Sequence, residues 1–127
     1  MIELSRCGVV KKGKILLLYR KKHEEWVFPG GKLDVNESKE NTAIRETKEE
    51  TGCDVKIKKF VCSEEFSFGP KNFKQYIFLV EMKGTPKIME PEEFSEIMWI
   101  NIEDYKKYPV SPHVVIFCEY FLKNQTK

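Results

Sequence analysis

The chain lacks a long apolar run, a paired-cysteine motif and an excess of charge of one sign. None of its hydrophobic runs approaches the roughly 20 residues that span a bilayer. Its 22 basic and 20 acidic residues leave a net charge of +2, so bulk charge gives no reason to expect nucleic-acid or membrane binding. Residues 1–4 lack the charged and then apolar pattern of a signal peptide, so we expect no export signal here.

The four cysteines are too scattered to form a zinc site. None belongs to a CxxC pair or stands at ligand spacing from a histidine. They lie within apolar or mixed segments, which favours reduced thiols in the core and a cytoplasmic protein. These residues are Cys7, Cys53, Cys62 and Cys118.

What the chain does have is enough apolar sequence for one folded domain. Its 127 residues are 41% apolar and 13% aromatic, without repeats or a linker, so we expect a single domain over 1–127. Apolar patterns predict strands at 3–10, 15–19, 54–66, 73–82 and 97–100, and a short apolar segment at 26–28.

Two helices are predicted from their capping residues. Ser38 and Gly52 are the expected N-cap and C-terminal stop of the first helix. Ser111 and Pro112 open the second, whose apolar stripe is Val114, Phe117, Cys118 and Phe121. Strands interrupted by two helices predict an α/β fold of the mixed α+β kind, with a mixed sheet covered on both faces.

Three glutamates of the first predicted helix carry the main functional signal. Glu46, Glu49 and Glu50 stand at spacing i, i+3 and i+4, so they share one helix face. Like charges in this arrangement repel by a few tenths of a kcal/mol. A hard divalent cation such as Mg²⁺ or Mn²⁺ would offset that repulsion. The alternative is a solvated acidic face, which is the commoner case for an isolated E-x-x-E-E.

The surrounding residues favour the metal site. The chain fits the pattern G-x5-E-x7-R-E-U-x-E-E-x-G-U, where U is a bulky apolar residue, from Gly31 to Cys53. This is the signature of the Nudix hydrolases, and the chain resembles that family over nearly its whole length. Thr47 and Cys53 depart from the pattern at the two U positions. Because both are small and semi-apolar, we expect softer packing rather than lost chemistry.

The resemblance implies a Nudix fold in which Glu46, Glu49 and Glu50 bind metal and Glu46 is a candidate general base. Nudix domains often use a further glutamate from a distant loop as a metal ligand or base. The acidic segment 90–96 is the expected source. We select Glu93, whose spacing before Trp99 resembles the MutT-like branch, with Glu96 second. An ordinary acidic surface loop is the alternative.

Other motif positions have structural roles by resemblance. Arg45 and Glu37 match a pair in which the arginine orients the glutamates and closes the loop onto the helix. Gly31 matches the glycine that lets the loop fold against the helix, and Gly52 matches the glycine at the end of the motif.

The segment before the motif resembles the W-x-F-P-G-G-K entry of MutT-like nucleoside triphosphate pyrophosphohydrolases. Gly30 and Gly31 permit close backbone approach to a ligand. Lys32 is expected to contact a phosphate as a point charge, and a solvated loop lysine is the alternative. Phe28 is a candidate to pack beside a base, although aromatic residues are more often found in the core. Arg20 begins a basic stretch that would face phosphates or form a solvated loop.

Taken together, the resemblance implies a Mg²⁺- or Mn²⁺-dependent hydrolase that cleaves a nucleoside diphosphate linked to another moiety. We expect a (d)NTP, giving the monophosphate and pyrophosphate. A dinucleoside polyphosphate or nucleotide-sugar hydrolase, and a non-catalytic nucleotide-binding module, are the alternatives. Pro112 stands where MutT-like enzymes that read an oxidised guanine have an asparagine. We expect a small-molecule partner, neither membrane nor nucleic acid, and a possible homodimer.

Overall fold

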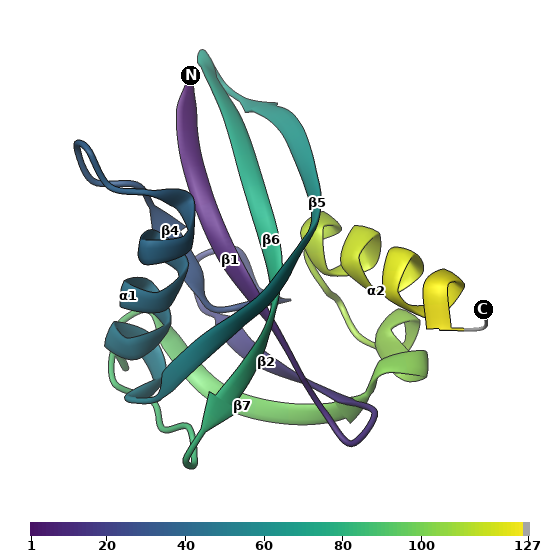
Figure 1. The fold of residues 1–127 in the computed structure, drawn as a ribbon. Coiled ribbons are helices and arrows are strands. Elements are labelled where there is room, and N and C mark those ends of the chain that lie inside the picture. The colour runs from purple at the N-terminus through teal and green to yellow at the C-terminus, as the bar shows by residue number, and fades with distance from the viewer. Residues whose placement is uncertain (126–127) are drawn as a thin grey trace.

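A computed structural model describes residues 1–125 and shows two helices on opposite sides of a mixed sheet (Figure 1). The strands are β1 (Ile2–Lys11), β2 (Lys14–Arg20), β3 (Glu25–Val27), β4 (Gly30–Lys32), β5 (Asp54–Phe68), β6 (Lys71–Lys83) and β7 (Phe94–Asn101). The helices are α1 (Lys39–Thr51), α2 (Pro112–Gln125) and the short 3-10 helix η1 (Ile102–Lys107). This mixed α+β architecture confirms the predicted fold class.

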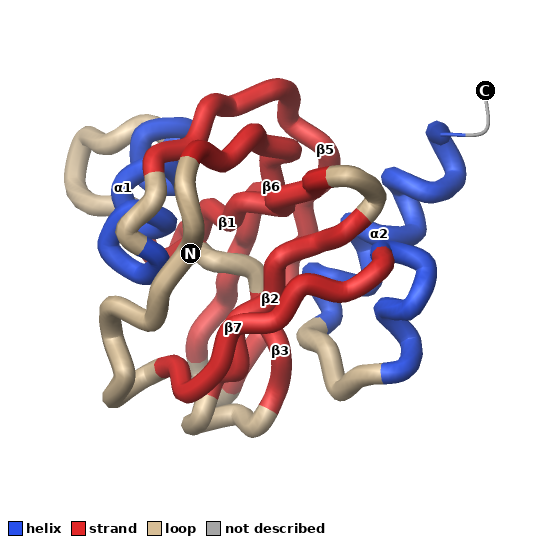
Figure 2. The backbone as a smooth tube through the Cα atoms, turned by 90° about the horizontal axis from the view of Figure 1, so that it is seen from below, coloured by secondary structure: helices blue, strands red, loops and turns tan. Residues whose placement is uncertain are grey.

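Strand β1 joins the two parts of the sheet. The strand order is β3-β2-β1-β6-β5, with β4 paired to β1 and β7 paired to β2. The β1–β6 pairing is parallel, and the remaining pairings are antiparallel. Only the end of β1, at Val10 and Lys11, pairs with β2. Figure 2 shows β2, β3 and β7 grouped on one side of the molecule, with α1 and α2 flanking the sheet.

The apolar run in β2 forms the centre of the core. Ile15, Leu16, Leu17 and Leu18 are all fully buried. Ile15 and Leu17 pack in the cluster that contains Phe117 of α2, whereas Leu16 packs in the cluster of the α1 face. The strand is therefore buried on both faces, as predicted. The α2 stripe also packs as predicted, with Val114, Phe117 and Cys118 fully buried and Phe121 partly buried.

Helix α1 begins and ends at the predicted residues. The Ser38 hydroxyl accepts a 3.0 Å hydrogen bond from the Asn41 N–H. Gly52 closes the helix in the left-handed conformation, at φ 76°. Thr47 is fully buried and Cys53 is nearly so. These two small residues therefore occupy core positions at which the family pattern has bulky apolar residues.

The structure adds elements that the sequence did not predict. Strand β4 pairs Gly30, Gly31 and Lys32 with β1, and η1 connects β7 to the α2 region. The cysteines are free, and Cys62 is only half-buried, whereas the other three are buried. Within residues 1–125, no helix has both the length and the apolar character to cross a membrane.

Candidate active site

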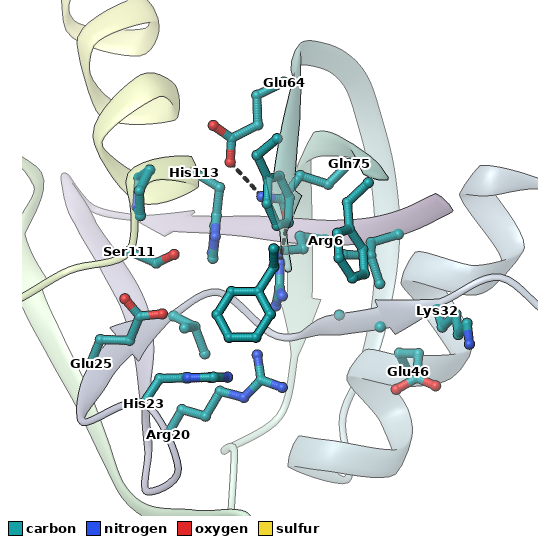
Figure 3. A pocket seen from close by; sticks show the side chains of 18 of the residues that line it. Arg6, Arg20, His23, Glu25, Lys32, Glu46, Glu64, Gln75, Ser111 and His113 are labelled. Carbon is teal, nitrogen blue, oxygen red and sulfur yellow. Dashed lines mark hydrogen bonds between the residues drawn. The ribbon is translucent and has the colours of Figure 1, made fainter. Parts of the chain in front are cut away.

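A pocket of about 700 Å³ lies beside α1 and brings together residues from distant parts of the chain (Figure 3). Figure 3 shows Lys32 and Glu46 on one side of it and Glu25, His23 and His113 on the other. Of the predicted site residues, those that line the pocket are Arg20, Gly30, Gly31, Lys32, Glu46, Glu50 and Glu93.

Glu50 is the most buried acidic group of this pocket, with only 3% of its surface exposed. Its Oε1 accepts a 2.9 Å hydrogen bond from the Gly30 N–H. Burial raises the pKa of Glu50 well above its usual range, and the nearby Glu46 and Glu93 add to this, while the Gly30 bond and Arg6 oppose it. A buried carboxyl among other carboxyls is a group that a bound cation would stabilise in its ionised form.

Glu46 lies against the backbone of Gly31. A Cβ atom on Gly31 would run into the Glu46 carboxylate, so the glycine leaves the space that this side chain occupies. Burial raises the pKa of Glu46, opposed in part by its hydrogen bond with Arg45. Glu49 is more exposed, at 46% of its side chain, and faces Arg45. Glu49 is not among the pocket-lining residues.

Arg45 connects the loop before α1 to the glutamates of the helix. Its Nε and Nη2 donate to the two oxygens of Glu37, at 2.8 and 2.9 Å. Its Nη1 donates to Glu46 at 2.9 Å and to Glu49 at 3.1 Å, and Nη2 reaches the Lys32 carbonyl at 3.2 Å. The guanidinium and two further hydrogen bonds lower the pKa of Glu37 to about 2. The Arg45 side chain thus fixes the positions of both the loop and the glutamate carboxylates.

The carboxylates are the type of ligand that a hard cation prefers, but they are not arranged as a complete coordination site. Among residues 1–125, no three Asp, Glu, His or Cys side chains are arranged as a ready ion site. Arg45 is paired with the carboxylates of Glu46 and Glu49, at 2.9 and 3.1 Å. The oxygens of Glu46 and Glu50 nevertheless belong to one pocket, and the hydrogen bond to Glu50 comes from a neutral N–H. These are ligands that Mg²⁺ and Mn²⁺ prefer.

Glu93 lies immediately before β7 and lines the pocket. Its carbonyl accepts a 3.0 Å hydrogen bond from the Lys21 N–H, and its Oε1 lies 3.9 Å from the Arg20 Nε. Glu96 stands opposite Tyr19 on β7, is exposed, and does not line the pocket. The structure therefore brings Glu93, rather than Glu96, to the glutamates of α1.

Glu90 is a further acidic group that the sequence did not single out. The Met89 N–H donates to the Glu50 carbonyl, which holds this loop against the end of α1. Burial raises the pKa of Glu90, and the charges of Glu93 and Glu49 raise it further. Four acidic residues crowd segment 90–96, so composition alone could not tell which of them approach the helix.

The expected contact of Phe28 with a base is corrected by its position. Phe28 is fully buried in the core, where its ring lies 5.1 Å from that of Phe117. It does not line the pocket, because residue 28 belongs to the core beneath α2. Other aromatic residues do, notably Phe66 and Phe73, whose stacked rings are 4.9 Å apart. They come from the β5–β6 hairpin, and no motif in the sequence marks them.

Comparison with known proteins places this chain among hydrolases of phosphoric anhydrides. A family model described as a NUDIX domain matches residues 4–117, and the chain belongs to that family. CTP pyrophosphohydrolase of Escherichia coli K12 is 27% identical over 127 residues, covering 96% of this chain and 92% of that protein.

Two further proteins show the breadth of this similarity. ADP-ribose pyrophosphatase of Bacillus subtilis 168 is 32% identical over 114 residues, which are 84% of this chain and 62% of that protein. The crystal structure of a MutT NUDIX hydrolase from Burkholderia pseudomallei superposes with a TM-score of 0.87 at 25% identity, covering 94% and 96% of the two chains.

Proposed function

We propose that the protein is a Mg²⁺-dependent pyrophosphohydrolase that cleaves a nucleoside diphosphate linked to another moiety. Its main substrate is a nucleoside or deoxynucleoside triphosphate, which gives the monophosphate and pyrophosphate. The observation that carries the proposal is one pocket that holds the buried Glu50 together with Glu46, Glu93, Arg20 and Lys32. Carboxylates for a cation beside basic side chains for phosphates are what cleavage of a phosphoric anhydride requires.

In this proposal Glu46, Glu49, Glu50 and Glu93 hold Mg²⁺ or Mn²⁺. When bound, the ion neutralises phosphate oxygens and lowers the pKa of a bound water. To serve as ligands, Glu46 and Glu49 give up hydrogen bonds with Arg45. Arg45 remains anchored by Glu37, so the helix and loop keep their positions.

The side chains around the ion bind phosphate and accept a proton. Lys32 and Arg20 bind phosphate oxygens from two sides of the pocket. Glu46 or Glu93 accepts the proton of the water that attacks phosphorus.

The preference for a triphosphate rests on the comparisons and on the pocket. A CTP pyrophosphohydrolase aligns along 92% of its own length, whereas an ADP-ribose pyrophosphatase aligns along 62%. A volume of about 700 Å³ falls in the range of small-molecule sites. Pro112 lines the pocket and offers no side-chain hydrogen bond, which argues against reading an oxidised guanine through this position.

We also infer a cytoplasmic setting from the free thiols, since such compartments keep cysteines reduced. Homodimer formation stays a prediction, and light scattering of the purified protein tests it.

A nucleotide panel tests the proposed function. Purified protein with Mg²⁺ is incubated with triphosphates, dinucleoside polyphosphates and nucleotide sugars, and released pyrophosphate and phosphate are read separately. We expect monophosphate and pyrophosphate from at least one triphosphate. Glu50→Gln should abolish this release, whereas Glu40→Gln, on the exposed part of α1, should not. Saturable binding without cleavage would indicate a binding module instead.

A further inference from the structure

A buried, positively charged side chain lines the pocket, and the proposed mechanism does not use it. Arg6 of β1 lines the pocket and is only 8% exposed. Its Nε donates to the Gln75 Oε1 at 2.7 Å, and its Nη1 donates to the Phe28 carbonyl at 2.9 Å. Both of these acceptors are uncharged.

A buried guanidinium with neutral partners is an unusual arrangement. Buried charges in proteins are ordinarily paired with an opposite charge. In the part of the chain that the structure describes, Arg6 takes part in no ion pair within 4.0 Å. Burial lowers the pKa of Arg6 to about 10 although the nearby charge of Glu50 opposes this, so the side chain remains protonated at neutral pH. The pocket floor therefore carries a positive charge that lacks a directly bonded anion.

Gln75 and Glu64 fix the position of this charge without neutralising it. Gln75 on β6 stands directly opposite Glu64 on β5, and its Nε2 donates to the Glu64 carboxylate. That bond orients the amide so that its oxygen faces Arg6. Figure 3 shows the resulting row of Glu64, Gln75 and Arg6 across the pocket. Removing Gln75 would free Arg6 to move while keeping its charge.

A second arginine adds to the positive character of this region. The Arg20 Nε is buried and has no hydrogen-bond partner, since its 3.9 Å approach to Glu93 is too long for a hydrogen bond. The positive charges of Arg6 and Arg20 both act on His113, which lies in the same pocket lining. The two side chains thus form a cationic region with unused hydrogen-bonding capacity.

Arg6 stands next to the carboxylate end of the pocket. A Cβ atom on Gly30 would collide with the Arg6 backbone and side chain, while the Gly30 N–H donates to Glu50. One glycine therefore separates the Arg6 stem from the carboxyl group expected at the metal site. If the pyrophosphate bond lies by Glu50, as the proposed function requires, a cation at this place would face the phosphate chain of the nucleotide.

We propose that Arg6 binds a phosphate oxygen of the nucleotide, with Gln75 and Glu64 as residues that position it. This inference rests on the proposed function, because it assigns Arg6 to the same substrate. It identifies the ligand group as an anionic phosphate oxygen rather than a base.

Inorganic pyrophosphate is a suitable probe, because it has no base and can be tested without a divalent cation. Its affinity is measured by calorimetry in EDTA for the wild type and variants, with thermal unfolding followed in parallel. We expect Arg6→Gln to weaken binding by about tenfold or more, as for loss of a charge-assisted hydrogen bond. Gln75→Leu retains the positive charge of Arg6 and should weaken pyrophosphate binding severalfold. Lys56→Gln, an exposed charge outside the pocket, should change it less than about twofold.

Arg6→Lys keeps the experiment informative if Arg6→Gln does not fold. It preserves the charge but carries its three donors on one atom instead of in a planar fork, so it matches Gln75, Phe28 and a ligand less well, and its affinity should fall between wild type and Arg6→Gln. A role limited to bracing the Phe28 backbone would lower the thermal midpoint and leave pyrophosphate affinity unchanged in every folded variant. That result, or failure of the wild type to bind pyrophosphate, would overturn the inference.

The nucleotide panel distinguishes this failure from failure of the proposed function. If the wild type hydrolyses nucleotides but the Arg6 variants bind pyrophosphate normally, the proposed function stands. Only the role assigned to Arg6 is then refuted.

Discussion

Gly31→Ala separates the geometry of the glutamates from the stability of the fold. The new Cβ would run into the Cδ and Oε2 atoms of Glu46, which belong to a flexible side chain rather than to backbone. Glu46 should therefore swing away and weaken its 2.9 Å bond with Arg45. Both side chains are partly exposed, so this bond is worth about 0.5–1 kcal/mol of unfolding free energy.

The functional effect of Gly31→Ala should be much larger than its effect on folding. Moving a catalytic carboxylate by about 1 Å can lower turnover by about 10²-fold. The new Cβ also fills the space beside residue 31 that Glu46 occupies, so Mn²⁺ affinity should weaken by about 10–100-fold, the range seen when groups that support metal ligands are lost. Urea denaturation, Mn²⁺ titration and pyrophosphate release measure the three quantities on one sample of protein.

Gly13→Ala is the matched control for this experiment. Gly13 has a positive φ of 76°, and open space surrounds the position of its Cβ. The substitution should lower the unfolding free energy by about 1 kcal/mol, the cost of a left-handed alanine, without affecting Mn²⁺ binding. The reasoning is refuted if Gly31→Ala binds Mn²⁺ and turns over normally. It also fails if that variant loses several kcal/mol of stability, because Glu46 would then not have moved freely.

Three further predictions concern Glu49, Glu37 and His113. Glu49→Gln should leave the thermal midpoint nearly unchanged and lower turnover by about 10²–10⁴-fold, and near-normal pyrophosphate release would count against a metal-binding role. The pKa of Glu37 falls from 4.5 to about 2 on folding, so the stabilisation it provides is complete above pH 4.5 and lost as the pH falls toward 2. Glu37→Gln should flatten the stability–pH curve in that range, and an unchanged curve would refute the link. His113, which accepts the Phe28 N–H at 3.1 Å, has a pKa lowered well below 6.5 by burial. Only the unfolded chain therefore gains this proton as the pH drops below 6.5, so stability should fall there in wild type and less in His113→Gln, and equal slopes would contradict the assignment.

Features encoded in short segments could be predicted from the sequence. The limits of α1 follow from Ser38 and Gly52, whose capping chemistry is local. The spacing and the family motif put Glu46, Glu49 and Glu50 on one face of that helix; Glu46 and Glu50 do line the pocket, whereas Glu49 is more exposed and does not. The spacing of Glu93 before Trp99 favours this residue as the further glutamate, and the structure does bring it to the pocket.

Features created by pairing between distant segments could not be predicted in this way. Gln75 reaches Arg6 because β1 and β6 pair in parallel, although the two residues are 69 positions apart in the sequence. Strand β4 exists because Gly30 and Gly31 pack against β1, and two glycines give no strand signal. Phe28 illustrates a different limit, since its motif position is compatible both with base contact and with the core, and only the structure places it in the core.

Titration of the metal-free protein with Mn²⁺, followed by electron paramagnetic resonance, tests the central claim most directly. We predict saturable binding in the wild type, weakened by about tenfold or more in Glu46→Gln and in Glu50→Gln, and unchanged in Glu40→Gln. Equal Mn²⁺ affinity in all four proteins, or no binding in the wild type, would contradict the claim that the inner face of α1 holds the catalytic cation.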